Sequence, residues 1–86
     1  MPDRKDYEAV LSSQAVAFLM ALPKGRQRKL CGLLSQLAGN PSQVGDYSEG
    51  DDAGRSVQFL HIADIVIAFW PDHAVKELRI VEIEEI

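Results

Sequence analysis

The segment Asp64–Trp70 constrains the fold most, because six consecutive apolar residues follow the aspartate. This run has the length of one strand and is too short for a buried helix. Alternate side chains of a strand point to opposite faces, and here both faces are apolar. The two sets are Ile65, Ile67 and Phe69 on one face, and Val66, Ala68 and Trp70 on the other. We therefore expect a central strand covered on both faces, although the rest of the chain supplies helices for only one.

Length and composition restrict the class of protein. The 86 residues predict one domain, 1–86, with a single modest core. No apolar run approaches the roughly 20 residues of a membrane span, and no apolar segment of a secretory signal follows the charged start, so the expected location is the cytoplasm. The net charge of −4 argues against direct nucleic-acid binding, which usually needs a basic surface.

The first half of the chain reads as a strand and a helical hairpin. Lys5–Leu11 alternates with one polar side, as expected of a strand near a sheet edge. Ser12 or Ser13 can cap a helix that reaches Leu22, in which Val16 and Met20 widen the apolar stripe for packing against a second helix. That second helix is expected at Lys24–Ala38, antiparallel to the first.

Smaller features of this hairpin also give expectations. Gly39 is expected to end the second helix in the left-handed conformation, before Pro41. The lone Cys31 excludes an intramolecular disulfide, and its helical neighbours predict a buried or half-buried packing role.

The start of the second helix carries the densest basic cluster of the chain. Its members are Lys24, Arg26, Arg28 and Lys29. Positive charge at a helix N-terminus opposes the helix dipole, at a cost of a few tenths of a kcal/mol for each exposed group. Two interpretations follow: a solvated helix face, or a docking patch for an acidic partner.

The second half of the chain predicts an antiparallel sheet, which makes the fold α+β. The acidic loop 41–54 contains a short strand around Tyr47, and its carboxylates lack the order of a calcium loop, so no metal or cofactor is expected. The expected strands and turns are a strand at Arg55–Ile62, a turn at Ala63–Asp64, the central strand, a turn at Pro71–Ala74 and a last strand at Val75–Ile83.

Few residues in the chain suggest catalysis. There is no phosphate-binding glycine loop, nucleophilic serine motif or paired metal-ligand spacing. His61, at a strand end, is the stronger acid–base candidate of the two histidines. Arg55 and Arg79 could hold a phosphate beside it. Alternatively, Glu77, two residues before Arg79 on the same face of the strand, could form an ion pair with Arg79.

Several short motifs, in order and spacing, resemble the RelE/ParE superfamily of small bacterial toxins, and more narrowly the ParE-like branch of type II toxin–antitoxin systems. They include Phe18-Leu-x-x-Leu-Pro23, Leu37-Ala-x-Asn-Pro41, Gly54-Arg55, Ala68-Phe-Trp-x-Asp-His73 and Val75-Lys-Glu-Leu-Arg-Ile80. The resemblance implies a helical hairpin, preceded by an N-terminal strand, against a curved antiparallel sheet of three or four strands.

The resemblance implies one of two activities. RelE-like members are ribosome-dependent mRNA endoribonucleases with basic residues on the open sheet face, whereas ParE-like members poison DNA gyrase. Here Val57 and Phe59 stand where such ribonucleases tend to have lysines, His61 lies near the place of an arginine, and the chain ends in Glu82–Ile86. We therefore expect a ParE-like, growth-inhibiting, plasmid-stabilising toxin that binds a target such as gyrase. The alternatives are a ribonuclease using Arg55, His61 and Arg79, or an inactive interaction module.

Both toxin types are neutralised by an antitoxin whose C-terminal segment wraps the toxin. The expected partner-binding residues are Lys24, Arg26, Arg28, Lys29, Phe59, Phe69 and Trp70. A disordered segment that folds on binding would supply the second cover of the central strand. Alternatively, a curved sheet fills its own concavity with these aromatic side chains.

Overall fold

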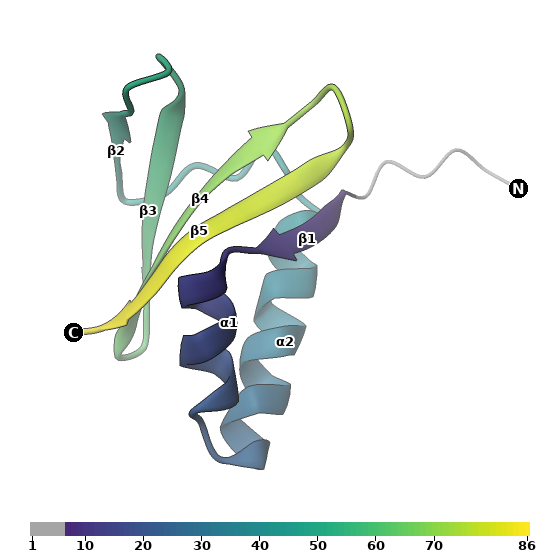
Figure 1. Ribbon diagram of the computed structural model, residues 1–86, viewed down its shortest axis with the longest axis vertical. Coiled ribbons are helices and arrows are strands. Elements are labelled where there is room, and N and C mark those ends of the chain that lie inside the picture. Colours follow the sequence, from purple (N-terminus) through teal and green to yellow (C-terminus); the bar gives the residue numbers. More distant parts are fainter. Residues whose placement is uncertain (1–6) are drawn as a thin grey trace, which may run out of the picture.

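In the computed structural model, which describes residues 7–86, two helices pack on one face of a five-stranded sheet (Figure 1). The helices are α1 (Ser13–Met20) and α2 (Lys24–Ala38). The strands are β1 (Glu8–Leu11), β2 (Tyr47–Gly50), β3 (Ser56–Ile62), β4 (Ile65–Asp72) and β5 (Glu77–Glu85). Their order is β1-β5-β4-β3-β2, so the apolar strand β4 is central, and the predicted α+β fold is confirmed.

The N-terminal strand lies at the sheet edge, as its one polar side predicts. β1 runs parallel to β5, whereas the other three strand pairs are antiparallel. The amide of Ser12 donates to the carbonyl of Ile80 (2.9 Å) and fixes the point where the chain leaves the sheet for α1. Lys5 and Asp6, the first residues of the predicted strand, lie outside the described residues.

A serine cap and a proline mark where the two helices of the hairpin begin. The Ser12 hydroxyl accepts from the amide of Ala15 (3.1 Å) and begins α1, while Pro23 precedes α2, whose predicted bounds are confirmed. The prediction for Gly39 is wrong, since its φ of −73° is right-handed. The last turn instead closes through the amide of Gly39, which donates to the carbonyl of Ser35 (3.0 Å).

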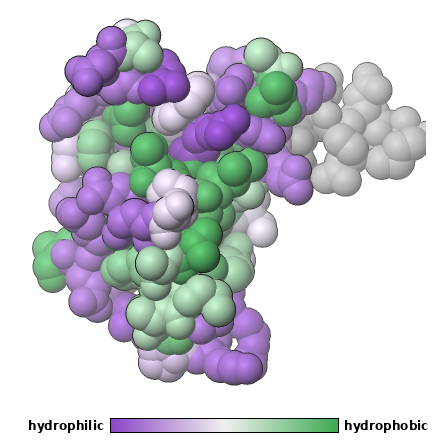
Figure 2. All heavy atoms as spheres, in the orientation of Figure 1, coloured by the Kyte–Doolittle hydropathy of each residue, from purple (hydrophilic) through white to green (hydrophobic). Residues whose placement is uncertain are grey.

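Two packing predictions for the helices are wrong. Val16 and Met20 are 45% and 65% exposed, and the outer side of α1 forms an apolar surface near the bottom of Figure 2. Cys31 is exposed because one residue step turns a helix by about 100°, which carries it away from the inward-facing Leu30.

The core lies between the hairpin and strands β4 and β5. Its fully buried large side chains all come from these two strands: Phe69, Ile67, Leu78, Ile80 and Ile83. They pack against one inward stripe of α2, formed by Leu30, Leu34, Leu37 and Ala38. Burial of one such side chain contributes about 1.5–3 kcal/mol, so this layer supplies most of the apolar stabilisation.

A β-bulge in β5 gives this core its shape. Ala68 pairs with Glu82 but the next residue, Phe69, pairs with Ile80, so Val81 is an extra residue in the bulged strand. Strict alternation predicts Ile83 on the face opposite Ile80, and that prediction is wrong because the bulge returns Ile83 to the core.

Helix α1 satisfies the backbone of the bulged segment. The Gln14 side chain donates to the carbonyl of Ile83 (2.8 Å) and accepts from its amide (2.9 Å). The Ser12 hydroxyl donates to the carbonyl of Val81 (2.7 Å). Local sequence does not reveal these contacts, because they join residues about 70 positions apart.

The turn between β4 and β5 comes later than predicted. Pro71 and Asp72 continue β4 and pair with Leu78 and Glu77, so the turn falls at residues 73–76 and β5 starts at Glu77 instead of Val75. The turn at Ala63–Asp64 is confirmed, with Ala63 at a left-handed φ of 56°.

Gly45, just before β2, is a position where only glycine fits. A Cβ there would lie 2.5 Å from the carbonyl oxygen of Phe59, which is backbone and cannot move aside. Gly45→Ala should therefore lower the free energy of unfolding by about 1–3 kcal/mol in urea titrations followed by circular dichroism. Gly50→Ala is the matched control, since nothing lies within 4 Å of its Cβ. Equal stability of the two variants would contradict this account.

Candidate functional site

The sheet face turned away from the helices is the first candidate surface, here called the open face. The strand register places on it alternate residues of β2 to β5, among them Tyr47, Phe59, His61, Val66, Ala68, Trp70, Arg79, Glu82 and Glu84. Phe69 is fully buried on the helix side, so the structure separates it from Phe59 and Trp70. Of the three aromatic residues predicted to contact a partner, two lie on the open face.

An aromatic cluster fills part of the open face. Tyr47 and Phe59, paired across β2 and β3, stack with ring centroids 4.9 Å apart and nearly parallel planes. The His61 ring meets Tyr47 edge-on at 6.0 Å. The concavity is therefore lined by the chain's own side chains, as one of the sequence alternatives expects, but Tyr47 takes the place predicted for Phe69.

The two arginines of the open face are both engaged by carboxylates. Arg79 Nη2 lies 2.9 Å from Glu77 Oε1, which confirms the predicted ion pair. Arg55 Nε lies 2.6 Å from Asp51 Oδ2, and its guanidinium carbon lies 4.4 Å from the centre of the Trp70 ring. The partly exposed Arg79–Glu77 pair contributes about 0–1 kcal/mol, and both pairs neutralise positive charge on this surface.

The loop before β3 is ordered around one carboxylate. Backbone N–H groups of Arg55 (2.8 Å) and Ala53 (2.9 Å) donate to Asp51 Oδ1. The hydrogen bond from the Arg55 backbone, and then the one from its side chain, hold the pKa of Asp51 below its usual value. The carboxylate therefore remains charged and keeps Arg55 over Trp70.

The candidate catalytic residues do not form one cluster. Arg79 pairs with Trp70 in the register and Arg55 lies over the same ring, so the two arginines flank Trp70. His61 pairs with Val66, which lies four residues before Trp70 in β4. At the rise of a strand this places His61 about 13 Å from Trp70 along the sheet. His61 is thus placed beside Tyr47 and apart from both arginines.

The opposite end of the open face is negative. Glu82 and Glu84 lie on the same face of β5, and among the described residues neither forms an ion pair with a basic group. Hydrogen bonding with Glu84, and repulsion by its charge, raise the pKa of Glu82. This end of the surface therefore disfavours a phosphate and favours a cationic or neutral group.

The repulsion between these glutamates should appear in the pH dependence of stability. Because folding raises the pKa of Glu82, the native state binds its proton more tightly, and stability falls as pH rises through that pKa. Glu82→Gln should therefore unfold at a higher temperature than the wild type at pH 7. This difference should disappear below about pH 4, where the wild-type carboxyl is protonated. Glu49→Gln on β2 controls for the loss of one charge. An advantage independent of pH would count against this interpretation.

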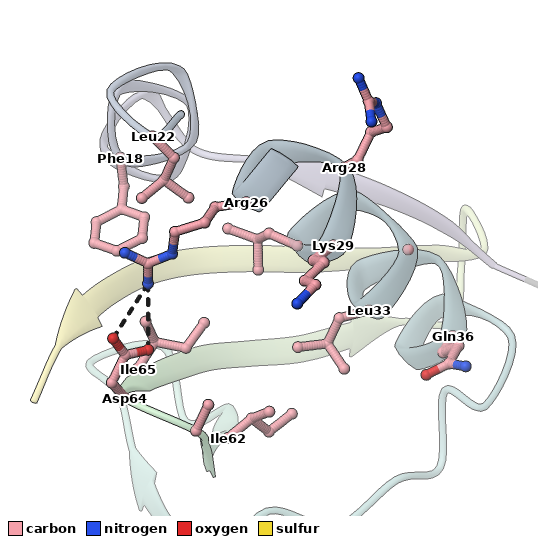
Figure 3. A pocket seen from close by; sticks show the side chains of 13 residues that line it. Phe18, Leu22, Arg26, Arg28, Lys29, Leu33, Gln36, Ile62, Asp64 and Ile65 are labelled. Atoms are coloured by element: carbon pink, nitrogen blue, oxygen red, sulfur yellow. Dashed lines mark hydrogen bonds and ion pairs between the residues drawn. The ribbon is translucent and has the colours of Figure 1, made fainter. Parts of the chain in front are cut away.

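A groove beside the hairpin is the second candidate surface. Its volume is about 960 Å³, and it lies between α2, the end of α1 and the β3–β4 turn (Figure 3). We call it the hairpin groove. Its apolar floor is formed by Phe18, Leu22, Leu30, Leu33, Ile62 and Ile65. The groove exists because the helices lie over β1 and β5 and leave β3 without a helical cover.

The hairpin groove continues along α2. A second hollow of about 420 Å³ shares Leu33, Gln36 and Ile62 with it and extends to Asn40 and Gln43. The combined trough therefore follows α2 from Arg26 and ends beside Asn40, two residues after the helix, which makes it about 21 Å long at the rise of a helix.

The four residues of the predicted basic cluster lie differently with respect to the groove. Arg26 crosses its mouth and binds Asp64 with contacts of 3.2 and 3.3 Å, with Glu85 at 3.9 Å (Figure 3). Lys29 points into the groove and has no ion pair with any of residues 7–86, whereas the guanidinium of Arg28 points away. Lys24 is not part of the lining.

Residues 7–86 contain neither a candidate metal site nor a helix that could span a membrane. No three side chains of His, Cys, Asp or Glu gather where they could hold a metal ion. In the same part of the chain, no helix combines the length and apolar character of a membrane span.

Comparison with solved structures shows the fold. A chain of the toxin–antitoxin complex RelBE2 from Mycobacterium tuberculosis superposes with a TM-score of 0.76 and 15% identity, covering 98% of both chains. A chain of the archaeal RelE–RelB complex from Pyrococcus horikoshii OT3 superposes with a TM-score of 0.71 and 16% identity, covering 93% of this chain and 94% of its own. No family model and no curated protein sequence matches. The arrangement of helices and strands is thus the RelE-like toxin fold.

Proposed function

We propose that this chain, which has the RelE-like toxin fold, is the toxin of a type II toxin–antitoxin system and acts in the cytoplasm until an antitoxin neutralises it. Support comes from the similarity over nearly the whole chain to proteins solved as toxin–antitoxin complexes. An uncovered apolar groove beside the hairpin is the kind of surface that a partner protein buries.

The toxin acts by binding a macromolecular target, such as DNA gyrase, in the manner of ParE-like members. The observation that carries this choice is the charge of the open face. Arg55 and Arg79 are engaged by carboxylates, and the Glu82–Glu84 pair occupies the same face. Cleavage of RNA needs positive groups that bind the phosphate and stabilise the charge that develops in the transition state.

The aromatic cluster supplies the contact with the target. Tyr47 is 47% exposed, and its stacking with Phe59 limits the conformational entropy lost on binding. Trp70 is held in place by the Arg55 guanidinium. Rigid aromatic side chains of this kind are frequent hot spots of protein interfaces.

A ribosome-dependent endoribonuclease is the second candidate, and one observation favours it. Arg55 and Arg79 flank the Trp70 ring, an arrangement on which a nucleotide base can stack beside positive charge. Both ion pairs are partly exposed and can exchange for a phosphate. His61 would then be the acid–base group.

Expression in a bacterial host without antitoxin, with growth, gyrase supercoiling and mRNA ends followed together, tests this function. We expect growth arrest, impaired supercoiling and intact mRNA. Phe59→Ala should relieve the arrest, because it removes the stacked aromatic surface, whereas Arg79→Ala, which removes only a paired arginine, should leave it in place. Circular dichroism of each variant checks folding.

Codon-specific mRNA cleavage that Arg79→Ala or His61→Ala abolishes would overturn the choice of target and support the ribonuclease. Normal growth with a folded and abundant protein would contradict the toxin function itself and leave an inactive interaction module.

A further inference from the structure

We infer that the hairpin groove receives an acidic amphipathic helix of about 14 residues from the partner protein, with a carboxylate placed against Lys29. The inference rests on the proposed function for the identity of that partner, the antitoxin. The properties of the bound segment are inferred from four features of the groove: its uncovered floor, its shape, the pairing of β3 and the distribution of charge.

The floor of the groove lacks a cover that the rest of this sheet face has. Leu33, Leu60 and Ile62 are only partly buried, although they pack against the core. In Figure 1 the hairpin covers the β5 side of the sheet, while β3 lies away from both helices. Burying one such side chain stabilises a complex by about 1.5–3 kcal/mol before the costs of association, so an apolar segment is favoured here.

The pairing of β3 selects a helix over a strand. β4 pairs with Gln58–Ile62 of β3 and β2 with Ser56–Phe59, and beyond β2 the amide of His61 donates to Asp46 Oδ2 (2.7 Å), so only a short end of β3 is left open to an added strand. A partner in the groove meets side chains only, as a helix laid in a groove does. The trough is about 21 Å long, which matches 14 helical residues with apolar groups at positions i, i+3, i+4 and i+7.

The charge of the groove selects carboxylates. Four basic residues, Lys24, Arg26, Arg28 and Lys29, lie near the positive end of the α2 dipole, and α2 has no acidic residue in its first turn. Arg26 is already bound by Asp64 and Glu85, whereas Lys29 points into the groove without an ion pair among the described residues. An acidic residue of the partner would relieve this accumulation of positive charge.

Asp64 is then an internal competitor for the partner's carboxylates. It lies on the wall of the groove opposite α2 and holds Arg26 across the mouth. Asp64→Asn removes this competing charge and leaves Arg26 with only the longer contact to Glu85 (3.9 Å). Binding of an acidic helix should become about two- to fivefold tighter, the range expected for one partly exposed ion pair.

A displayed library of 14-residue helices, selected on the full chain made by cell-free synthesis, tests the inference without knowledge of the antitoxin. We expect enrichment of amphipathic helices rich in Asp and Glu. Lys29→Glu should weaken the selected helices about tenfold and, in a repeated selection, favour basic residues instead. Lys24→Glu, the same change outside the lining, should cost less than about threefold.

Two further variants locate the binding site. Leu33→Asp, checked for folding by circular dichroism, and the exposed Gln36→Glu should both weaken the acidic helices, because both residues line the two hollows. Failure to enrich any helix, enrichment of neutral or basic helices, or equal binding to wild type and Lys29→Glu would each overturn the inference. Growth arrest is measured separately, so a toxin that binds no acidic helix contradicts this inference alone.

Discussion

The fold depends on one constraint, which is that β4 is apolar on both faces and therefore needs two covers. On the helix side, Ile65, Ile67 and Phe69 are buried beneath the hairpin. The bulge at Val81 brings Ile83 into the same layer, and Gln14 satisfies the backbone there. On the open face, aromatic side chains of neighbouring strands and the Arg55 guanidinium shield β4.

Both candidate surfaces follow from how these covers are distributed. The two helices lie over β1 and β5, and the core side chains of β4 reach them, but β3 has no helical cover, so the hairpin groove is what remains of an incomplete layer. The open face is lined by aromatic groups whose neighbouring charges are mostly neutralised, except at Glu82 and Glu84. The molecule thus presents a basic apolar groove on one side and an aromatic, partly acidic surface on the other.

The sequence predicts what local chemistry decides. The bounds of α2, the Ser12 cap, the central strand and the Arg79–Glu77 pair all depend on neighbouring residues or a two-residue period, and they are confirmed. The side of Ile83 and the continuation of β4 through Pro71 depend on distant contacts with α1 and β5, so local patterns misplace them. For the same reason the sequence indicates the basic side of the groove but not the residues of its floor, although the apolar Leu60 and Ile62 on one face of β3 are a signal for it.

Native-state hydrogen exchange on the isolated chain tests the central claim most directly, namely that the hairpin stabilises one half of the sheet and leaves the other half incomplete. Amides of β4 and β5 are expected to exchange only through global unfolding, whereas amides that join β3 to β2 should exchange through a smaller opening of lower free energy. Equal protection of all four strands would contradict the account, because the uncovered half of the sheet would then be as stable as the half beneath the helices.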